Sequence, residues 1–131
     1  MKLEDYFSKT TGVGVMSTAD GQGTVNSAIY ATPHFLGDGL LSFIARDRLT
    51  RKNLNENPSA HYLFIERNGG FRGIRLSLEK VAEREDEELI SKIARRAVEP
   101  SESDKPKRFL ITFKVKKILN LLGPQEVEFT H

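Results

Sequence analysis

The fold is decided by one stretch whose character changes twice: Leu41-Ser42-Phe43-Ile44-Ala45, then Arg46-Asp47-Arg48-Leu49, then Thr50-Arg51-Lys52-Asn53-Leu54-Asn55-Glu56-Asn57-Pro58. The first part is an apolar run of the length typical of a buried strand. In the third part, Thr50 is a residue type that favours the N-cap of a helix, and Asn57-Pro58 ends that helix. The stretch therefore predicts a strand, a basic turn and a short helix, in that order.

Positive charge is concentrated in this turn and in the start of the helix. Four of the chain's 20 lysines and arginines lie within seven positions, where an even spread would place about one: Arg46, Arg48, Arg51 and Lys52. Unpaired backbone N–H groups at a helix start favour an anion, and guanidinium, ammonium and the Thr50 hydroxyl can all donate to phosphate oxygens. The pattern predicts a site for a terminal phosphate. The alternative is a basic turn that only faces water, as charge runs usually do.

Upstream of this stretch, the sequence predicts a helix and a hairpin. Lys2 to Lys9 has apolar residues at helical spacing. Gly12 to Ala19 is a strand of small residues, and the Asp20-Gly21 pair favours a tight turn after it. The returning strand, Thr24 to Thr32, has small or apolar residues on both faces, so we expect it to be covered on both sides.

Downstream, three more strands and one longer helix are predicted. Ser59 to Glu66 and Phe71 to Glu83 read as strands joined by a glycine-rich turn, and Ile74, Leu76 and Leu78 share one face of the second strand. Asp86 to Val98 carries an apolar stripe at helical spacing. Apolar residues alternate over Arg108 to Lys117, which predicts a last strand that Ile118 to Gly123 can extend.

The order of these elements indicates the fold class. About six strands follow one another mainly through short turns, which favours antiparallel pairing because parallel neighbours need long crossovers. The chain has 131 residues, of which 38% are hydrophobic and 29% charged, as expected for one globular domain. We therefore predict a mainly β fold: a six-stranded antiparallel split barrel of the Greek-key type, with peripheral helices, forming a single domain over residues 1–131.

Composition excludes several functional classes. The absence of cysteine rules out disulfides, thiolate nucleophiles and cysteine zinc sites. No metal site is predicted, because His34, His61 and His131 share no ligand spacing with one another or with a carboxylate. A formal charge of +2 does not indicate nucleic acid. There is no apolar run long enough to span a membrane, and the acidic start is unlike a signal peptide, so we expect a cytoplasmic protein that binds no membrane.

The strand, the basic turn and the helix ending in Asn57-Pro58 resemble a segment of the pyridoxamine 5′-phosphate oxidase-like split barrels. In that flavin-binding family a strand is followed by a Ser/Thr-Arg-Lys turn and a short helix ending in Asn-Pro. The similarity extends upstream to the Val13 to Thr18 strand and the Val25-Asn26-Ser27 strand, and downstream to the strand that begins near Ala60. The resemblance implies FMN held between the two subunits of a homodimer.

The resemblance also implies which residues lie near each part of the cofactor. Thr50, Arg51 and Lys52 would lie at the FMN phosphate with Arg48 assisting, and Asn53 near the ribityl–phosphate end. Backbone groups of two strands would run beside the isoalloxazine ring: Phe43, Ile44, Ala45 and Arg46 from one, and Asn26, Ser27 and Ala28 from the other.

The function implied by the resemblance is an FMN-dependent oxidoreductase with a small-molecule redox partner. No catalytic acid, base or nucleophile can be assigned from the residues. Authentic pyridoxamine phosphate oxidase activity is not expected, because residues 126–131 contain nothing like the Arg-x-His element that the authentic oxidases carry near the C-terminus. Two alternatives remain open: a flavin-binding electron-transfer protein without a substrate of its own, and the same barrel holding haem or a deazaflavin.

Overall fold

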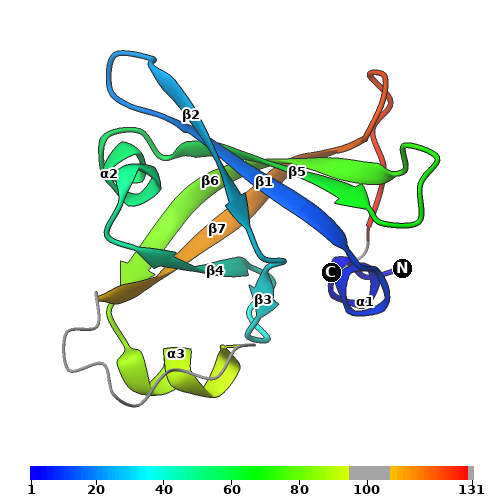
Figure 1. Ribbon diagram of the computed structural model, residues 1–131. Helices are drawn as coiled ribbons and strands as arrows, with labels where there is room; N and C mark the ends of the chain where they lie inside the picture. The colour runs from blue at the N-terminus through cyan, green and yellow to red at the C-terminus, as the bar shows by residue number, and fades with distance from the viewer. Residues whose placement is uncertain (95–106, 130–131) are drawn as a thin grey trace.

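A computed structural model describes residues 1–94 and 107–129 as a curled antiparallel sheet with three helices (Figure 1). None of the helices in these two ranges is long and apolar enough to cross a membrane. In chain order the elements are α1 (Leu3–Lys9), β1 (Gly12–Ala19), β2 (Val25–Tyr30), β3 (His34–Phe35), β4 (Leu41–Arg46), α2 (Leu49–Glu56), β5 (Ser59–Glu66), β6 (Gly73–Arg84), α3 (Glu87–Ile93) and β7 (Arg108–Asn120).

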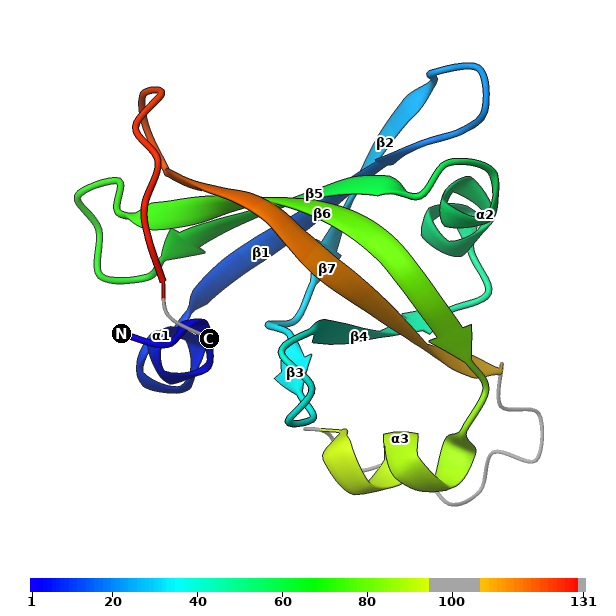
Figure 2. The same ribbon diagram turned by 180° about the vertical axis from the view of Figure 1, so that it is seen from behind.

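The strands form one sheet in the order β2-β1-β5-β6-β7-β4-β3, and every neighbouring pair is antiparallel. From the edge strand β2 the chain crosses to the other end of the sheet for β3 and β4, then returns through α2 to β5 beside β1 (Figures 1 and 2). The predicted antiparallel split barrel with peripheral helices is confirmed. The predicted count of six strands was one short, because His34–Phe35 pairs with Leu41 and Ser42 as a separate two-residue strand.

The sheet curls because its two longest strands are irregular. The pairing of β6 with β7 shifts register between Ser77 and Leu78 and again between Lys80 and Ala82. Such bulges bend a strand and increase its twist. The bend brings the two ends of the sheet together, since the ring of Tyr30 on β2 lies 6.2 Å from the ring of Phe43 on β4.

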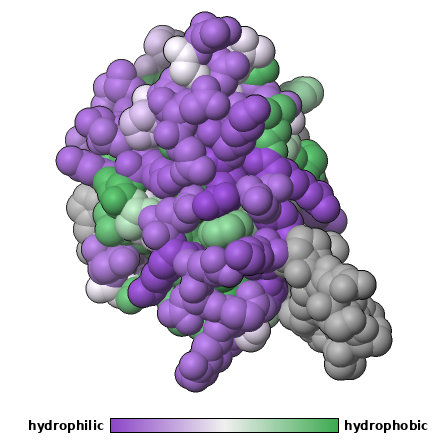
Figure 3. Space-filling view, turned by 90° about the vertical axis from the view of Figure 1, so that its left-hand side faces the viewer, coloured by the Kyte–Doolittle hydropathy of each residue, from purple (hydrophilic) through white to green (hydrophobic). Residues whose placement is uncertain are grey.

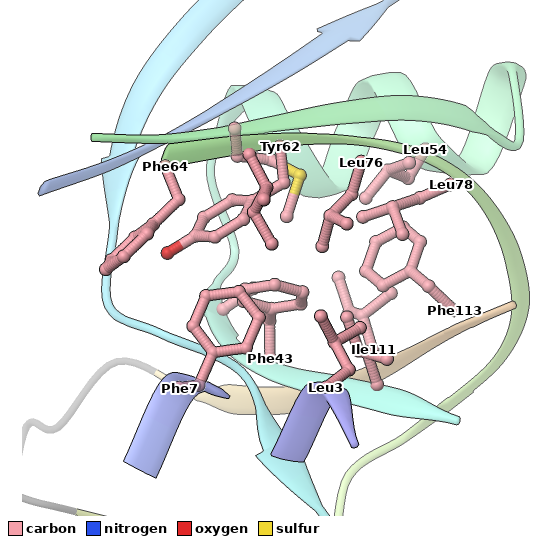
Figure 4. Packing of buried hydrophobic residues seen from close by; sticks show 14 of the residues in the cluster. Leu3, Phe7, Phe43, Leu54, Tyr62, Phe64, Leu76, Leu78, Ile111 and Phe113 are labelled. Carbon is pink, nitrogen blue, oxygen red and sulfur yellow. The ribbon is translucent and has the colours of Figure 1, made fainter. Parts of the chain in front are cut away.

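The main core fills the concave side of the sheet and is closed by α1 (Figure 4). Leu3 and Phe7 of α1 point into it, and the predicted core face of β6 is buried as expected. Tyr62 is fully buried at the centre, and its hydroxyl donates to the carbonyl oxygens of Tyr30 and Ala31 at 3.2 and 3.1 Å. The core thus also fixes the connection that follows β2.

The first half of β7, residues 108–113, is buried on both faces, although apolar residues alternate in its sequence. Leu110 of β7 and Ile90 of α3 are both fully buried, because α3 covers the outer face of β7. Arg108 binds Glu87 of α3 and so ties the helix to the strand. The helix α3 ends at Ile93, because the backbone of its C-cap residue Ala94 is extended, and residues 95–98 of the helix predicted to Val98 lie outside the described residues.

Two other local predictions were wrong. The strand β2 is not covered on both sides, because its outward side chains Val25 and Ile29 are 68% and 72% exposed. The helix α2 begins at Leu49 with Arg48 at the N-cap, so Thr50 lies inside the first turn, where it is buried. Both differences matter for the site, because the first leaves one apolar surface open and the second places Thr50 within the first turn of α2 instead of at its N-cap.

Candidate functional site

An open cleft lies between β2, β4 and the start of α2. Its volume is about 430 Å³, within the range usual for small-molecule sites. We call it the β2–β4 cleft. It is lined by Asn26, Ala28, Ile29, Tyr30, Ala31, Ile44, Arg46, Arg48, Leu49 and Thr50.

Strand geometry explains which of the predicted residues line this cleft. Successive side chains of a strand point to opposite faces. On β4, Phe43 and Ala45 are buried in the core, so Ile44 and Arg46 face the cleft. On β2, Asn26 and Ala28 line the cleft in the same way. The structure therefore brings together six of the predicted residues: Asn26, Ala28, Ile44, Arg46, Arg48 and Thr50.

The cleft is electropositive at the end where α2 begins. Arg46 and Arg48 both line it, and no aspartate or glutamate is among its described lining residues. The first helical hydrogen bond of α2 runs from the Lys52 N–H to the Arg48 carbonyl at 3.1 Å, and no side chain caps the N-terminus. The N–H groups of the first turn are thus available to a bound anion.

Tyr30 lines the cleft but was not among the site residues predicted from the sequence. Its phenol makes a hydrogen bond with the Thr50 hydroxyl and lies near Arg48. Burial raises the pKa of the Tyr30 phenol above its ordinary value, although the hydrogen bond with Thr50 and the positive charge of Arg48 oppose the rise. Tyr30 is therefore protonated at neutral pH and can donate a hydrogen bond in the cleft. Only its position beside α2, which depends on the curl of the sheet, distinguishes it from a core tyrosine.

Six other predicted residues do not line the cleft. Phe43 and Ala45 are in the core, and the Ser27 hydroxyl bonds the Ser17 hydroxyl on the outer face. The remaining three come from α2: Lys52 is exposed, Asn53 is buried and donates to the Thr18 hydroxyl at 3.1 Å, and Arg51 is bound to Asp47 and Glu83.

A second, smaller cavity of about 190 Å³ lies at the other end of the molecule, between α1, the loop before β4, and β7. Its walls are mainly apolar, and it contains none of the predicted site residues: Lys2, Leu3, Glu4, Phe35, Gly37, Gly39, Leu41, Val115, Ile118 and Phe129. The charge and the donor groups needed to hold a phosphate ester are found in the β2–β4 cleft.

Comparison with protein families places residues 4–122 in the family described as pyridoxamine 5′-phosphate oxidase. The chain belongs to this family. The match covers all of the helices and strands except the first residue of α1, so the basic turn and the β2–β4 cleft both lie within the family domain.

Solved structures with this oxidase-like fold superpose on most of the chain. An FMN-binding protein from Syntrophomonas wolfei subsp. wolfei has a TM-score of 0.72 and 22% identity, over 95% of this chain and 86% of that one. HupZ from Group A Streptococcus has a TM-score of 0.70 and 19% identity, over 96% of each chain. An F420 reductase has a TM-score of 0.63 and 18% identity, over 88% of this chain and 94% of that one. Identities this low establish a common fold and no more, and among curated proteins no match is found.

Proposed function

We propose that this member of the oxidase family is a flavoprotein that holds FMN in the β2–β4 cleft. The observation that carries the proposal is the combination of a basic, donor-rich end at α2 with a wall of small and apolar side chains. FMN has the matching shape, a dianionic phosphate joined to a flat aromatic ring. The phosphate needs positive charge and hydrogen-bond donors, and the ring needs an apolar wall.

The residues present fit both parts of the cofactor. Arg48, the N–H groups at the start of α2 and the Thr50 hydroxyl would hold the phosphate. Ala28 and Ile44 would form the apolar wall against the ring, and the small side chain of Ala28 would leave room for it. When bound, FMN supplies one- and two-electron redox chemistry, and the chain binds and orients it.

We further propose that the working unit is a homodimer. The outer face of β1, β2 and β5 carries exposed apolar side chains: Val13, Val25, Ile29 and Ile65, with exposed fractions between 39% and 72%. Ile29 also lines the β2–β4 cleft, so the cleft opens beside this face. A second copy seated there would cover the apolar surface and complete the cleft. The side that carries α2 is mainly hydrophilic (Figure 3).

FMN titration followed by flavin fluorescence tests the cofactor and its position. Replacing Arg48 by Gln removes one charge-assisted contact of about 1.5–3 kcal/mol, so FMN affinity should fall roughly ten- to a hundredfold. Riboflavin lacks the phosphate, and its affinity should change little. Arg72→Gln is the matched control, because Arg72 is exposed in the distant turn between β5 and β6. A wild-type protein that binds no FMN would refute the proposal.

The proposed activity is oxidoreduction of a small molecule. Steady-state turnover of the FMN-loaded protein with NADH or NADPH and a range of acceptors tests it. Stoichiometric FMN binding without turnover of any donor and acceptor would instead support an electron-transfer protein.

A deazaflavin is the second candidate cofactor, since the F420 reductase shares the fold over 88% of this chain. A deazaflavin also carries a flat ring and phosphate, so the cleft suits both. A competition titration in which F420 displaces bound FMN, while FMN does not displace bound F420, would favour the deazaflavin. Haem needs an axial ligand, and among the described lining residues of the cleft Tyr30 is the one side chain of a type that ligates haem iron, with no histidine, cysteine or methionine beside it. The visible spectrum after incubation with each cofactor separates the three.

A further inference from the structure

Arg51 occupies a position in the structure that differs from the role its sequence suggests. Its Nη1 donates to Asp47 at 2.9 Å and its Nη2 to Glu83 at 2.8 Å. The guanidinium carbon lies 3.6 Å above the centre of the Phe109 ring. One face of the group is thus stacked, and two of its nitrogens are held by carboxylates from different elements.

The geometry of α2 turns Arg51 away from the β2–β4 cleft. Successive helical residues are about 100° apart, so Thr50 can face the cleft while Arg51 faces β6. Asn55, one turn later, lies on the same face and accepts a hydrogen bond from Lys80 of β6 at 2.8 Å. This face of α2 is therefore fastened to β6 at two levels.

The charge of Arg51 is also balanced locally. Glu83 receives a second cation, Lys80, at 3.3 Å, so two carboxylates and two cations form one group with no net charge. Burial disfavours the charged form of Glu83, but the hydrogen bond from Arg51 and the charge of Lys80 outweigh it and lower the pKa of this carboxyl. The Nε of Arg51 makes no hydrogen bond among the described residues, but it is buried, so a ligand could not reach it unless the side chain left Phe109.

From these contacts we propose that Arg51 is a positioning residue and not a phosphate ligand. It joins the turn at Asp47 and the first turn of α2 to β6, and so fixes the backbone that presents Arg48 and Thr50 to the cleft. The direct ionic contact with the cofactor phosphate then falls to Arg48. The assignment of Arg48 rests on the proposed function, whereas the fixing of the turn does not.

Glu83→Gln distinguishes a positioning role of Arg51 from direct binding of the phosphate. It removes the negative charge that holds Arg51 in place, and this charge supports cofactor binding only if Arg51 is a positioning residue. In that case Glu83→Gln should weaken FMN binding, by roughly fivefold or more, and leave riboflavin binding unchanged. Arg51→Lys should weaken FMN binding similarly, because lysine cannot bind two carboxylates in a fork while stacking on a ring. If Arg51 instead contacts the phosphate, Glu83→Gln frees it and tightens FMN binding, and Arg51→Lys retains most of the affinity. That result would overturn the proposal.

The matched control is Glu79→Gln. Glu79 lies on the same strand and is also paired with a cation, Lys116 at 3.5 Å, but among the described residues it forms no ion pair with α2. Its replacement should leave FMN affinity unchanged.

A readout without cofactor keeps this inference separate from the proposed function. In the ligand-free protein, Glu83→Gln and Arg51→Lys should both speed hydrogen exchange of the backbone amides that are hydrogen-bonded at this turn, those of Arg48 and Lys52, while Glu79→Gln should not. Unchanged exchange at these amides would refute the positioning role even if FMN binds. Faster exchange in a protein that binds no FMN would uphold the positioning role and reject the proposed function alone.

Discussion

Gly14 shows how little space the core leaves at a single residue. It lies on β1 opposite Phe64, and a Cβ at this position would come within 1.8 Å of the Tyr62 hydroxyl oxygen. Tyr62 cannot withdraw, because it is fully buried and its hydroxyl is bound to two carbonyl groups. A glycine at this position is therefore a requirement of packing.

We expect Gly14→Ala to lower the free energy of unfolding by roughly 1–3 kcal/mol, as overpacking usually does. Urea denaturation measures this change. Gly21→Ala is the control, because the nearest atom to its added Cβ would be 3.4 Å away, on the exposed side chain of Glu56. Equal stability of both variants and the wild type would contradict the described packing around Tyr62.

His61 should make stability depend on pH. It lies on the outer face of β5 between Ser17 and Ser77, and burial together with the charge of Arg75 lowers the pKa of its imidazole below the usual 6.5. Between that lowered value and 6.5 the unfolded chain binds more protons than the folded one, so the free energy of unfolding falls as pH falls through this window.

His61→Gln should remove this part of the pH dependence, because glutamine takes up no proton. Urea denaturation at neutral pH and at about pH 5 measures the difference for each protein. Replacing His34 by Gln leaves His61 in place, so that variant should keep the fall. A fall of the same size in the His61 variant would exclude His61 as its source.

At the scale of elements, α2 is held by a different bond on each side. Arg51 and Asn55 bind β6, Asn53 binds Thr18 of β1, and Glu56 accepts from the Gly21 N–H in the β1–β2 hairpin at 3.0 Å. The helix has only eight residues and could not be stable by itself. Its position is therefore set by tertiary bonds, and the start of the cleft is set with it.

The buried pair Thr18 and Asn53 allows a clean test of this attachment. Thr18→Val alone leaves the Asn53 amide without its acceptor in a buried place, and should cost roughly 1–3 kcal/mol of unfolding free energy. The double variant Thr18→Val with Asn53→Leu removes both polar partners and should be more stable than either single variant. Thermal denaturation of the three proteins measures this, and additive losses would contradict a direct bond between the two side chains.

Sequence reasoning succeeded where an element is determined by its own residues. The alternation of Ile74, Leu76 and Leu78 predicted the core face of β6, and Asn57-Pro58 predicted the end of α2. It failed where a partner distant in the chain decides. Glu83 lies 32 residues after Arg51, so no local pattern could show that this arginine faces a carboxylate. The exposure of Ile29 likewise depends on β2 being an edge strand of the sheet.

At the scale of the whole molecule, the open apolar face should control assembly. Ile29 is 72% exposed on this face and also lines the cleft. Ile29→Asp places a charge where a second copy would bury it, so the variant should be monomeric and should bind FMN more weakly than the wild type. Light scattering after gel filtration measures the mass, and fluorescence titration measures the affinity.

Leu122→Asp is the control for assembly. Leu122 is 66% exposed, but it follows β7 and lies outside the β1, β2 and β5 face. The Leu122→Asp variant should therefore remain dimeric. A wild-type protein that is monomeric at all concentrations would remove the homodimer from the proposal.

The strand order also has a consequence for the order of events during folding. The walls of the β2–β4 cleft come from strands that four others separate in the sheet, and β4 pairs with β7 across some 70 residues of chain. Closing loops of that length is slow, and the two walls meet only after it is done. A bound cofactor therefore stabilises contacts that form late. Added FMN should lower the rate of unfolding and leave the refolding rate almost unaltered.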